Sequence, residues 1–298
     1  MDELTADDLY KGLLAHGLFC EKLPPVFSSE AFFDYCKSLT APFADAPKQY
    51  ISFSSMRNIN EPRQFAIPNP MAYQKLCRCL ADNWVYLQFH FKNKTGTQTH
   101  KVSRIHIRKL HDSEKIFDMD YNGIEVASFL KIKHAEKIFD MNYKNWKNDP
   151  SPDPDLRIGM KFIVKADVAT CFPSMYTHSL AWALAGKETA KVNRKQTEWF
   201  NQIDRFTQQI RHGETHGFFI GPHTSNLLSE IILVCIDHEL IEQGYKFIRR
   251  VDDYSCYVDS YENGQQFLSE LNKHLHSYDL LLNHKKTEIL ELPTTSEQ

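Results

Sequence analysis

The order of helix and strand patterns in the second half of the chain constrains the fold most. An apolar run with β-branched residues predicts a buried strand over 162–168, and apolar residues at helical spacing predict a long helix with one apolar face over 223–243. In chain order the predicted elements are a strand, three helices, the two strands of a hairpin, a helix and two short strands, at 162–168, 176–185, 194–211, 223–243, 245–251, 254–258, 264–278, 280–283 and 287–292. This order is typical of an α+β fold in which helices back an antiparallel sheet.

The chain divides at a proline-rich linker. The segment NDPSPDPD (148–155) separates a first part, 1–160, from a second part, 161–298, for which the sheet is predicted. In the first part, apolar spacing predicts a helix from residue 71 that gives way to a strand over 85–89, where apolar residues alternate.

Each part has a predicted insertion. The first lies around 92–155 and contains the octapeptide EKIFDMDY (114–121), which recurs as EKIFDMNY (136–143). Two copies are too few for a solenoid, so we interpret the repeat as a local duplication. The second insertion is helical and lies around 186–212.

The composition excludes several classes of protein. Hydrophobic residues make up 42% and charged residues 24%, which is typical of a folded chain and not of a disordered one. The longest apolar runs are far shorter than the roughly 20 residues of a membrane span, and the acidic first residues predict no signal peptide. Seven scattered cysteines without a CxxC pair argue against a disulfide framework or a cysteine-rich zinc site, and they favour the reducing cytoplasm.

The net charge is −3, but the basic residues are unevenly distributed. Lys and Arg concentrate in the stretches 92–109 and 187–211. Two interpretations are open: both stretches are solvated surfaces, or they contact nucleic acid.

Three aspartates are the strongest candidates for chemistry. Asp167 ends the first predicted strand, and Asp252 and Asp253 lie at the hairpin tip. Carboxylates at a strand end and on an adjacent hairpin can hold two divalent cations, one activating an attacking hydroxyl and one stabilising the leaving pyrophosphate. Mg²⁺ suits such oxygen ligands, with Mn²⁺ as an alternative ion. The competing interpretation is ordinary turn chemistry for the Asp-Asp pair and a solvated strand end for Asp167.

These aspartates lie in motifs that resemble those of reverse transcriptases, and the motifs follow the family's order. The matching segments are RNINEPR before IPNP (57–70), DVATCF (167–172), GFFIGPHTSN (217–226), VDD (251–253) and NHKKT (283–287). The resemblance covers roughly residues 50–292. It implies a right-hand polymerase with fingers in the first part and a palm in the second, and the activity of an RNA-directed DNA polymerase, a nucleotidyltransferase.

The chain is most similar to one branch of that family, the bacterial abortive-infection and defence-associated reverse transcriptases. The segments that carry this similarity are LYKGLL (9–14), LPPVF (23–27), PSMYTHS (173–179) with WA (182–183), and IGP (220–222) with Glu230. Members of this branch act in antiphage immunity. Some are similar to template-independent DNA polymerases that prime on their own protein and form homo-oligomers.

The same resemblance implies partners for the chain. They are deoxynucleoside triphosphates and nucleic acid, as a DNA product or an RNA template, in the bacterial cytoplasm and away from membranes. The family usually continues into a thumb, and this branch into a helical C-terminal domain, whereas only eleven residues follow Thr287. Two explanations are open: the sequence is a piece of a longer chain, or a homo-oligomer or a partner subunit supplies the missing parts.

The resemblance implies metal ligands at Asp167, Val168, Asp252 and Asp253. It also assigns a catalytic role to Lys286, whose ammonium protonates the leaving pyrophosphate or balances its charge. The competing interpretation for Lys286 is an exposed turn lysine.

Four further residues are implied to bind substrate. Arg57 and Arg63 grip the triphosphate through charge-assisted hydrogen bonds, and Gly221 lies in the second palm motif. Phe172 fills the space that a ribose 2′-hydroxyl would need. The competing interpretations are surface charge for the arginines and a core aromatic for Phe172.

Two departures from the family pattern concern template reading. Arg250 replaces the usual Tyr of the hairpin, and Phe219-Ile220 replaces the usual Pro-Gln of the second motif. The lost amide normally lies against the nascent base pair, and each lost hydrogen bond is worth about 0.5–1.5 kcal/mol. We therefore predict weak template reading with phosphoryl transfer retained.

The main competing hypothesis is a non-catalytic nucleic-acid-binding or assembly module that retains the palm fold. Three carboxylates close together argue against it, because their mutual repulsion needs a metal ion to offset it.

Overall fold

The computed structural model describes residues 3–20, 22–24, 26–58, 61–109, 139–142 and 152–293. It is a mixed structure of helices and antiparallel sheets, as predicted. Its helices are α1 (Ala6–His16), α2 (Glu30–Ser38), α3 (Pro70–Asp82), α4 (Trp84–Thr95), α6 (Asp153–Leu156), α7 (Cys171–Ser174), α8 (His178–Ala185), α9 (Lys187–Val192), α10 (Trp199–Ile210), α11 (His223–Glu242) and α12 (Tyr261–Ser277). Its strands are β1 (Ile51–Asn58), β2 (Glu61–Ile67), β3 (His106–Lys109), β4 (Phe139–Asn142), β5 (Phe162–Asp167), β6 (Phe247–Arg250), β7 (Asp253–Val258) and β8 (Glu288–Glu291).

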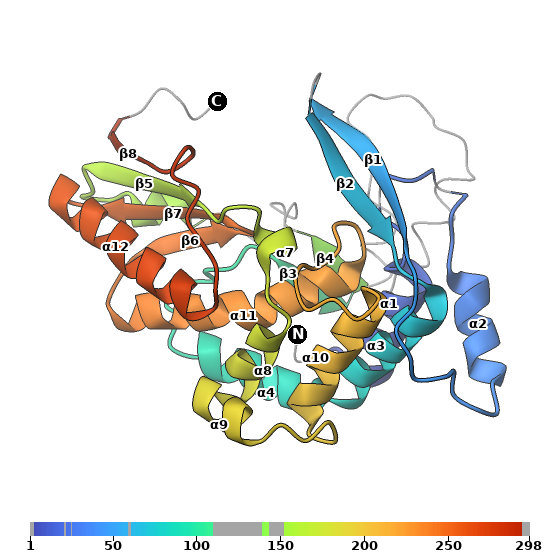
Figure 1. Cartoon of the computed structure of the whole chain (residues 1–298). Coiled ribbons are helices and arrows are strands. Elements are labelled where there is room, and N and C mark those ends of the chain that lie inside the picture. Colours follow the sequence, from blue (N-terminus) through green and yellow to red (C-terminus); the bar gives the residue numbers. More distant parts are fainter. Residues whose placement is uncertain are drawn as a thin grey trace.

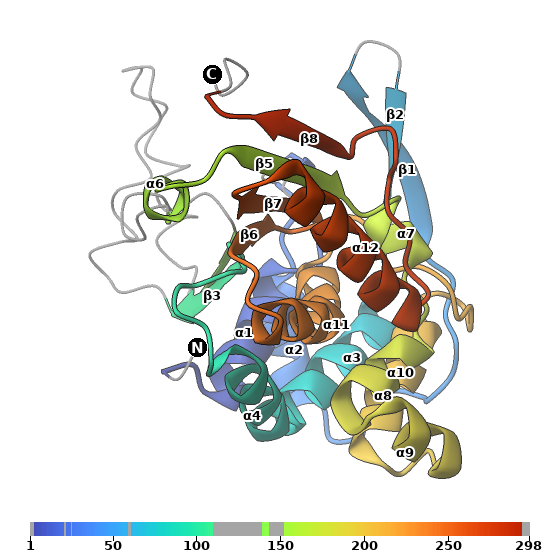
Figure 2. The same cartoon turned by 90° about the vertical axis from the view of Figure 1, so that its left-hand side faces the viewer.

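The largest sheet has the strand order β6-β7-β5-β8, and all neighbours are antiparallel. Helix α12 lies across one face of it, with α11 beneath (Figure 2). The close approach of α12 depends on Gly264, where an added Cβ would lie 3.2 Å from side-chain carbons of Val164 and Ile289. The predicted antiparallel sheet backed by helices is therefore confirmed.

The opposite face of this sheet is also apolar. Ile163, Ile248 and Tyr257 point to that side and pack against Leu156 of α6. Because both faces are covered, β5 is a nearly continuous apolar run and does not alternate with polar residues.

Helix α11 is buried on almost all sides. The sequence predicts a single apolar face, but α4, α8 and α12 pack around the helix, so that even Ser225, Ser229 and Glu230 are buried. The prediction of the helix is confirmed, and the prediction of a single buried face is wrong. The exposed residues of the helix are confined to its last turn, at Glu239 and Glu242, so no continuous solvated face marks its orientation.

The predicted strand over 85–89 is wrong, because this segment belongs to helix α4. Trp84, Leu87 and Phe91 form its buried face, three and four residues apart, whereas the side chains of Val85 and Phe89 are 73% and 65% exposed. Helical spacing of the buried residues outweighs the alternation of apolar ones. The short strand predicted at 280–283 is also absent. In this segment Leu282 forms an isolated β-bridge with Val168, the residue that follows β5.

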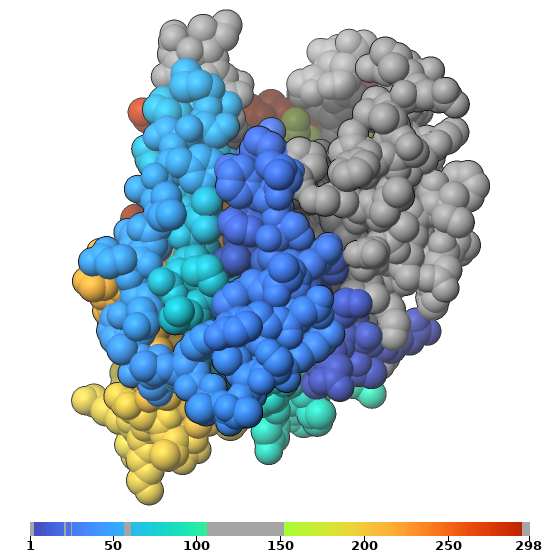
Figure 3. Space-filling model, turned by 90° about the vertical axis from the view of Figure 1, so that its right-hand side faces the viewer, coloured from blue at the N-terminus to red at the C-terminus, as the bar shows by residue number. Residues whose placement is uncertain are grey.

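The hairpin β1–β2 rises from the helices beside the large sheet (Figures 1 and 3). Its strands pair in antiparallel register, with Ser55 opposite Arg63. Its base is joined to the loop before α11, because the Ala66 amide donates to the Ile220 carbonyl at 3.2 Å. The hairpin therefore starts from a fixed base next to the C-terminal half.

The proposed first insertion is described only in part. Strands β3 and β4 pair with His106 opposite Asn142, and β4 contains four residues of the second octapeptide copy, EKIFDMNY. The first copy lies outside the described residues. The second predicted insertion, 186–212, contains α9 and α10.

The division into parts 1–160 and 161–298 remains a prediction, and the two parts are closely packed. Helix α4 contacts α11, and Ser103 forms an isolated parallel β-bridge with Arg249 of the edge strand β6. Within the part of the chain that the structure describes, no helix is long and apolar enough to cross a membrane.

The buried imidazole of His90 gives the fold a predictable pH dependence. It lies in hydrogen-bond contact with the Ile231 carbonyl at 3.0 Å, and burial lowers its pKa from 6.5 to about 4. The unfolded chain therefore binds a proton in this window that the folded chain rejects, so stability decreases as pH falls from about 6.5 to about 4. We expect up to about 3 kcal/mol from this group.

The check compares denaturant unfolding of the parent and His90→Gln at several pH values. Glutamine keeps an N–H donor for the Ile231 carbonyl but does not titrate. The variant should lose this component of the pH dependence, and an identical dependence in both proteins would contradict the assignment.

Candidate functional site

The three aspartates converge at one end of the large sheet. Asp167, the last residue of β5, lies opposite Asp253, the first residue of β7. Asp252 precedes it in the hairpin turn, and its carbonyl accepts a hydrogen bond from the Val168 amide at 3.1 Å. Residues 85 positions apart in the sequence are thus adjacent because β5 and β7 are paired strands.

The turn that carries Asp252 is unusual. Val251 has a positive φ of 62°, a conformation that is rare for a β-branched residue. Its carbonyl accepts a hydrogen bond from Nη1 of Arg249 at 2.8 Å. The conformation of the turn is therefore stabilised by the Arg249 side chain.

A second unusual turn follows Asp167. Thr170 has a φ of 44° and directs the chain from β5 into α7, where Phe172 lies. The Phe172 side chain is half-buried against the main core, and its carbonyl accepts from the Phe218 amide at 2.6 Å. The chain after Asp167 is consequently attached to the loop before α11.

Asp167 is paired with a lysine and an amide. Lys286 Nζ donates to Oδ2 of Asp167 at 2.9 Å, and Asn283 Nδ2 donates to Oδ1 at 2.8 Å. The backbone amide of Asn283 also donates to the backbone carbonyl of Asp167 at 2.8 Å. The segment between α12 and β8 thus brings the predicted Lys286 to the carboxylates.

The charges of the site are concentrated and partly buried. Burial and the charge of Asp167 raise the pKa of Asp252, whereas Lys286 and Arg63 act in the opposite direction. Burial and the charges of Asp252 and Asp167 raise the pKa of Asp253 to about 6. The influence of Arg63 shows that the hairpin β1–β2 brings a positive charge within electrostatic reach of the aspartates.

The donor set can accommodate magnesium in its usual open form. Within the described residues, no three His, Cys, Asp or Glu side chains enclose a metal ion. Mg²⁺, however, uses one or two carboxylates together with water and substrate phosphates. Asp167 and Asp252 offer such carboxylates, and the Lys286 ammonium lies where Asp167 can bind a cation. Val168 has no side-chain oxygen, so the only oxygen it could offer a metal is its backbone carbonyl.

The four predicted substrate-binding residues differ in their position relative to the aspartates. Arg63 is exposed on β2, near the aspartates, and Phe172 follows Asp167 closely. The side chain of Arg57 lies outside the described part of the structure. Gly221 has a φ of 129°, and an added Cβ would lie 2.8 Å from Cys20 Cβ, so this glycine fits a contact with the N-terminal segment.

Phe219 and Ile220, which stand where the family has Pro-Gln, have different environments. Phe219 is buried, with its ring 4.6 Å from that of Tyr50 and 5.0 Å from the guanidinium of Arg211. Ile220 is half-exposed. Phe219 is therefore a packing residue, and Ile220 presents no side-chain amide at this loop.

Arg249 and Asp237 were not identified from the sequence, and Asn283 was given only as part of the motif NHKKT, without a role of its own. Arg249 lies in the apolar strand β6 and is fully buried against Glu230 and Asp237. A signal was available: the two acids lie seven residues apart on either side of the apolar run IILVCI in α11, and an arginine lies two residues before Val251. Buried acids at helical spacing call for a buried cation.

Comparisons with known proteins give limited similarity. The chain matches no protein-family model and no curated protein. An apo telomerase from Candida tropicalis is 13% identical, with a TM-score of 0.47 over 88% of this chain and 47% of that one. The same telomerase truncated from its C-terminal domain is 11% identical, with a TM-score of 0.46 over 95% and 60%.

A telomerase from Candida albicans, in complex with a fragment of telomeric RNA, is 18% identical, with a TM-score of 0.34 over 46% of this chain and 27% of that one. The chain thus spans less than two thirds of each of these telomerases. At TM-scores below 0.5 these similarities decide neither fold nor function.

Proposed function

We propose that the chain is a DNA-synthesising nucleotidyltransferase of reverse-transcriptase type. The observation that carries the proposal is the convergence of Asp167, Asp252 and Asp253 at one end of the sheet, with Lys286 bound to Asp167. The geometry supports the motif resemblance, because these four residues come from three matching segments that are far apart in the sequence: DVATCF (167–172), VDD (251–253) and NHKKT (283–287). The substrates are deoxynucleoside triphosphates.

In this proposal Asp167 and Asp252 hold divalent cations, with Asp253 at their side. When bound, these ions activate the attacking hydroxyl and neutralise the charge of the phosphates. Arg63 attracts the triphosphate from the hairpin β1–β2, and Lys286 leaves Asp167 to meet the pyrophosphate charge. Electrostatic stabilisation of this kind is the main contribution that a protein makes to phosphoryl transfer.

A second candidate function is a non-catalytic module with the same fold. One observation favours it: the Lys286–Asp167 ion pair at 2.9 Å balances a carboxylate without any metal ion. The two functions differ in a single assay. Incorporation of labelled deoxynucleotides that requires Mg²⁺ supports the enzyme, and its absence under all primer conditions supports the module.

We further propose that synthesis depends little on a template. The loop before α11 presents Ile220 where the family has an amide, while the triphosphate is held by charge. Product sequence should then reflect nucleotide preference. By resemblance to the abortive-infection branch, a tyrosine hydroxyl of the protein serves as the primer, and the physiological setting is antiphage defence by a homo-oligomer or by a complex with a partner subunit.

The test offers homopolymeric RNA templates in turn, with each deoxynucleotide alone and in mixture, and sequences the product. We expect the same composition with every template, and product that stays on the protein through denaturation until protease releases it. Product that follows the complement of each template would refute template independence while leaving the polymerase intact.

A further inference from the structure

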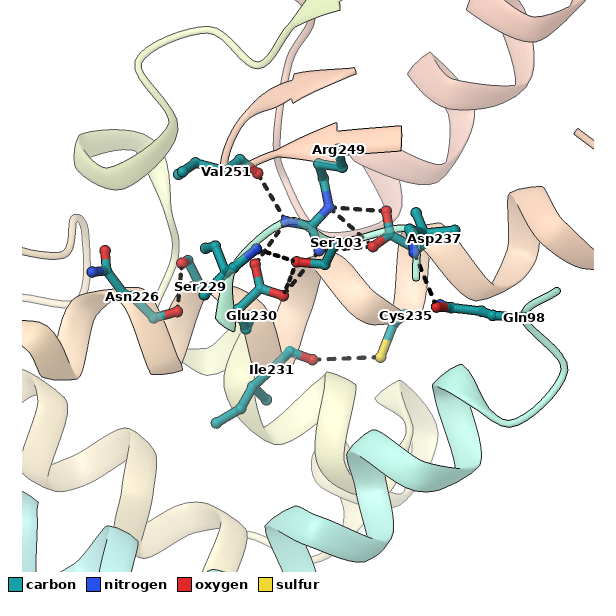
Figure 4. Close-up of polar contacts among 12 residues, drawn as sticks. Gln98, Ser103, Asn226, Ser229, Glu230, Ile231, Cys235, Asp237, Arg249 and Val251 are labelled. Carbon is teal, nitrogen blue, oxygen red and sulfur yellow. Dashed lines mark hydrogen bonds and ion pairs between the residues drawn. The ribbon is translucent and has the colours of Figure 1, made fainter. Parts of the chain in front are cut away.

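The guanidinium of Arg249 is buried behind the candidate site, and all three of its nitrogens donate hydrogen bonds (Figure 4). Nε donates to both Asp237 oxygens at 3.0 and 2.9 Å, and Nη2 donates to Asp237 at 2.7 Å. Nη1 and Nη2 donate to the two Glu230 oxygens at 2.7 and 3.1 Å, and Nη1 also donates to the Val251 carbonyl at 2.8 Å. Arg249 therefore joins two acids of α11 to the turn that carries the catalytic aspartates.

The position of Arg249 is fixed from the backbone as well. Its amide donates to the Val102 carbonyl at 2.9 Å, and its carbonyl accepts from the Arg104 amide at 2.8 Å. Between them, Ser103 donates its hydroxyl to Glu230 at 2.9 Å. The backbone of Arg249 is therefore fixed by β6 and its neighbours, and its guanidinium is fixed by the carboxylates of Glu230 and Asp237. The hydrogen bond from Nη1 then determines where the Val251 carbonyl lies.

The Val251 carbonyl is a sensitive point of the turn. Its peptide leads directly to Asp252, and Val251 itself has the rare positive φ. Strained conformations of this kind persist only where the surroundings enforce them. Because Asp253 must face Asp167 across the sheet, a rotation of this peptide would move both hairpin carboxylates relative to Asp167.

Stability alone does not explain the cluster. Buried ion pairs recover little more than the cost of removing their charges from water, and apolar residues of similar volume often serve the fold equally well. Arg249, Glu230 and Asp237 are all buried, at 0%, 4% and 0% exposure. An apolar cluster in the same place would fill the space but would offer no donor to the Val251 carbonyl.

We infer that Arg249 is a positioning residue that sets the orientation of the Asp252-Asp253 turn through the Val251 carbonyl, with Glu230 and Asp237 holding its guanidinium in place. The inference rests on the proposed function for its catalytic consequence. The guanidinium makes paired contacts with both carboxylates and a further one with the carbonyl. A lysine ammonium has three donors and no planar fork, so it cannot reproduce them.

The first experiment measures incorporation kinetics of Arg249→Lys in the full chain. We expect kcat to decrease about a hundredfold, as for other small displacements of reacting groups, with little change in KM for the deoxynucleotide. Arg205→Lys is the matched control, because Arg205 also pairs with an acid, Asp45 at 3.0 Å, but has no contact with the turn. An Arg249→Lys enzyme with the parent's kcat would overturn the inference.

A second variant separates positioning from stability. In the triple variant Arg249→Met/Glu230→Leu/Asp237→Leu, no buried charge is left without a partner, so the thermal stability should be close to the parent's. We expect its kcat to remain as low as that of Arg249→Lys. A triple variant that folds and regains the parent's kcat would show that the cluster only supports the fold, and would overturn the inference.

A readout without catalysis keeps the inference distinct from the proposed function. Hydrogen exchange of the amides of residues 251–254 should be faster in Arg249→Lys than in the parent, while the amides of β5 remain protected. If the parent incorporates no nucleotide, the proposed function fails, but this exchange difference still supports the role of Arg249 in the turn. Equal exchange in both proteins would overturn it.

Discussion

Asp167→Asn protein is expected to fold normally and to incorporate deoxynucleotides at least about a hundredfold more slowly than the parent. Asparagine keeps nearly the same shape, and its oxygen still accepts from Asn283, but it has no charge to bind a cation. The loss of charge removes both the attraction for the metal ion and the pairing with Lys286. The measurement is the initial rate with Mg²⁺ and labelled nucleotide, alongside thermal unfolding.

The two hairpin aspartates should differ in this assay. Asp252→Asn is expected to resemble Asp167→Asn, because Asp252 is the more buried of the pair and its carbonyl binds the Val168 amide. Asp253 is the most exposed of the three, although its carboxyl is buried enough to raise its pKa, and its substitution should have the smallest effect. Asp34→Asn is the control, since this exposed acid pairs only with Lys37 on α2. Parent-like rates in Asp167→Asn would disprove the two-metal assignment.

The site could be predicted as far as local sequence determines it. The apolar run of β5 and the paired strands around Asp252 have strong local patterns, and the pairing of adjacent strands then brings Asp167 opposite Asp253. The order of motifs placed Lys286 near the same end, and the structure gives the contact at 2.9 Å. The position of Asp167 opposite Asp253 follows from antiparallel pairing, whereas the expectation for Lys286 came from the family resemblance alone.

Other features depend on contacts that no local pattern encodes. Residues 85–89 have both an alternating and a helical pattern, and the helix forms because Leu87 and Phe91 fit against the core next to α11. The burial of α11 on almost all sides likewise depends on helices from three other parts of the chain. Periodicity describes a single element, whereas packing decides which of its faces are covered.

The role of Arg249 shows the same limit at the level of chemistry. The motif comparison draws attention to Arg250, which replaces the family's Tyr, yet Arg250 points outward and pairs with Asp153 at 2.8 Å. The neighbouring Arg249 points inward, because side chains alternate along β6, and it meets the acids of α11. A motif identifies positions, but the strand pleat decides which of two adjacent arginines is buried.

Phe172→Val is expected to increase the use of ribonucleotides relative to deoxynucleotides by about tenfold or more. The structure gives the ring a fixed place: Thr170 turns the chain after Asp167, and the Phe172 carbonyl is held by the Phe218 amide. The ring is half-buried, so one part packs on the core while the rest is exposed, and Phe172 follows Asp167 by five residues. Removing it opens space for a 2′-hydroxyl without removing any charge.

The measurement is the ratio of kcat/KM for matched ribo- and deoxynucleoside triphosphates in the parent and in Phe172→Val. Phe172→Tyr is the control, because it keeps the ring and should keep the parent's ratio. The competing interpretation, a core aromatic only, gives a different result: thermal stability decreases in Phe172→Val, because a buried ring is lost, while the ratio stays unchanged. Since stability and sugar selection are measured independently, an unchanged ratio would reject the selective role even in a destabilised enzyme.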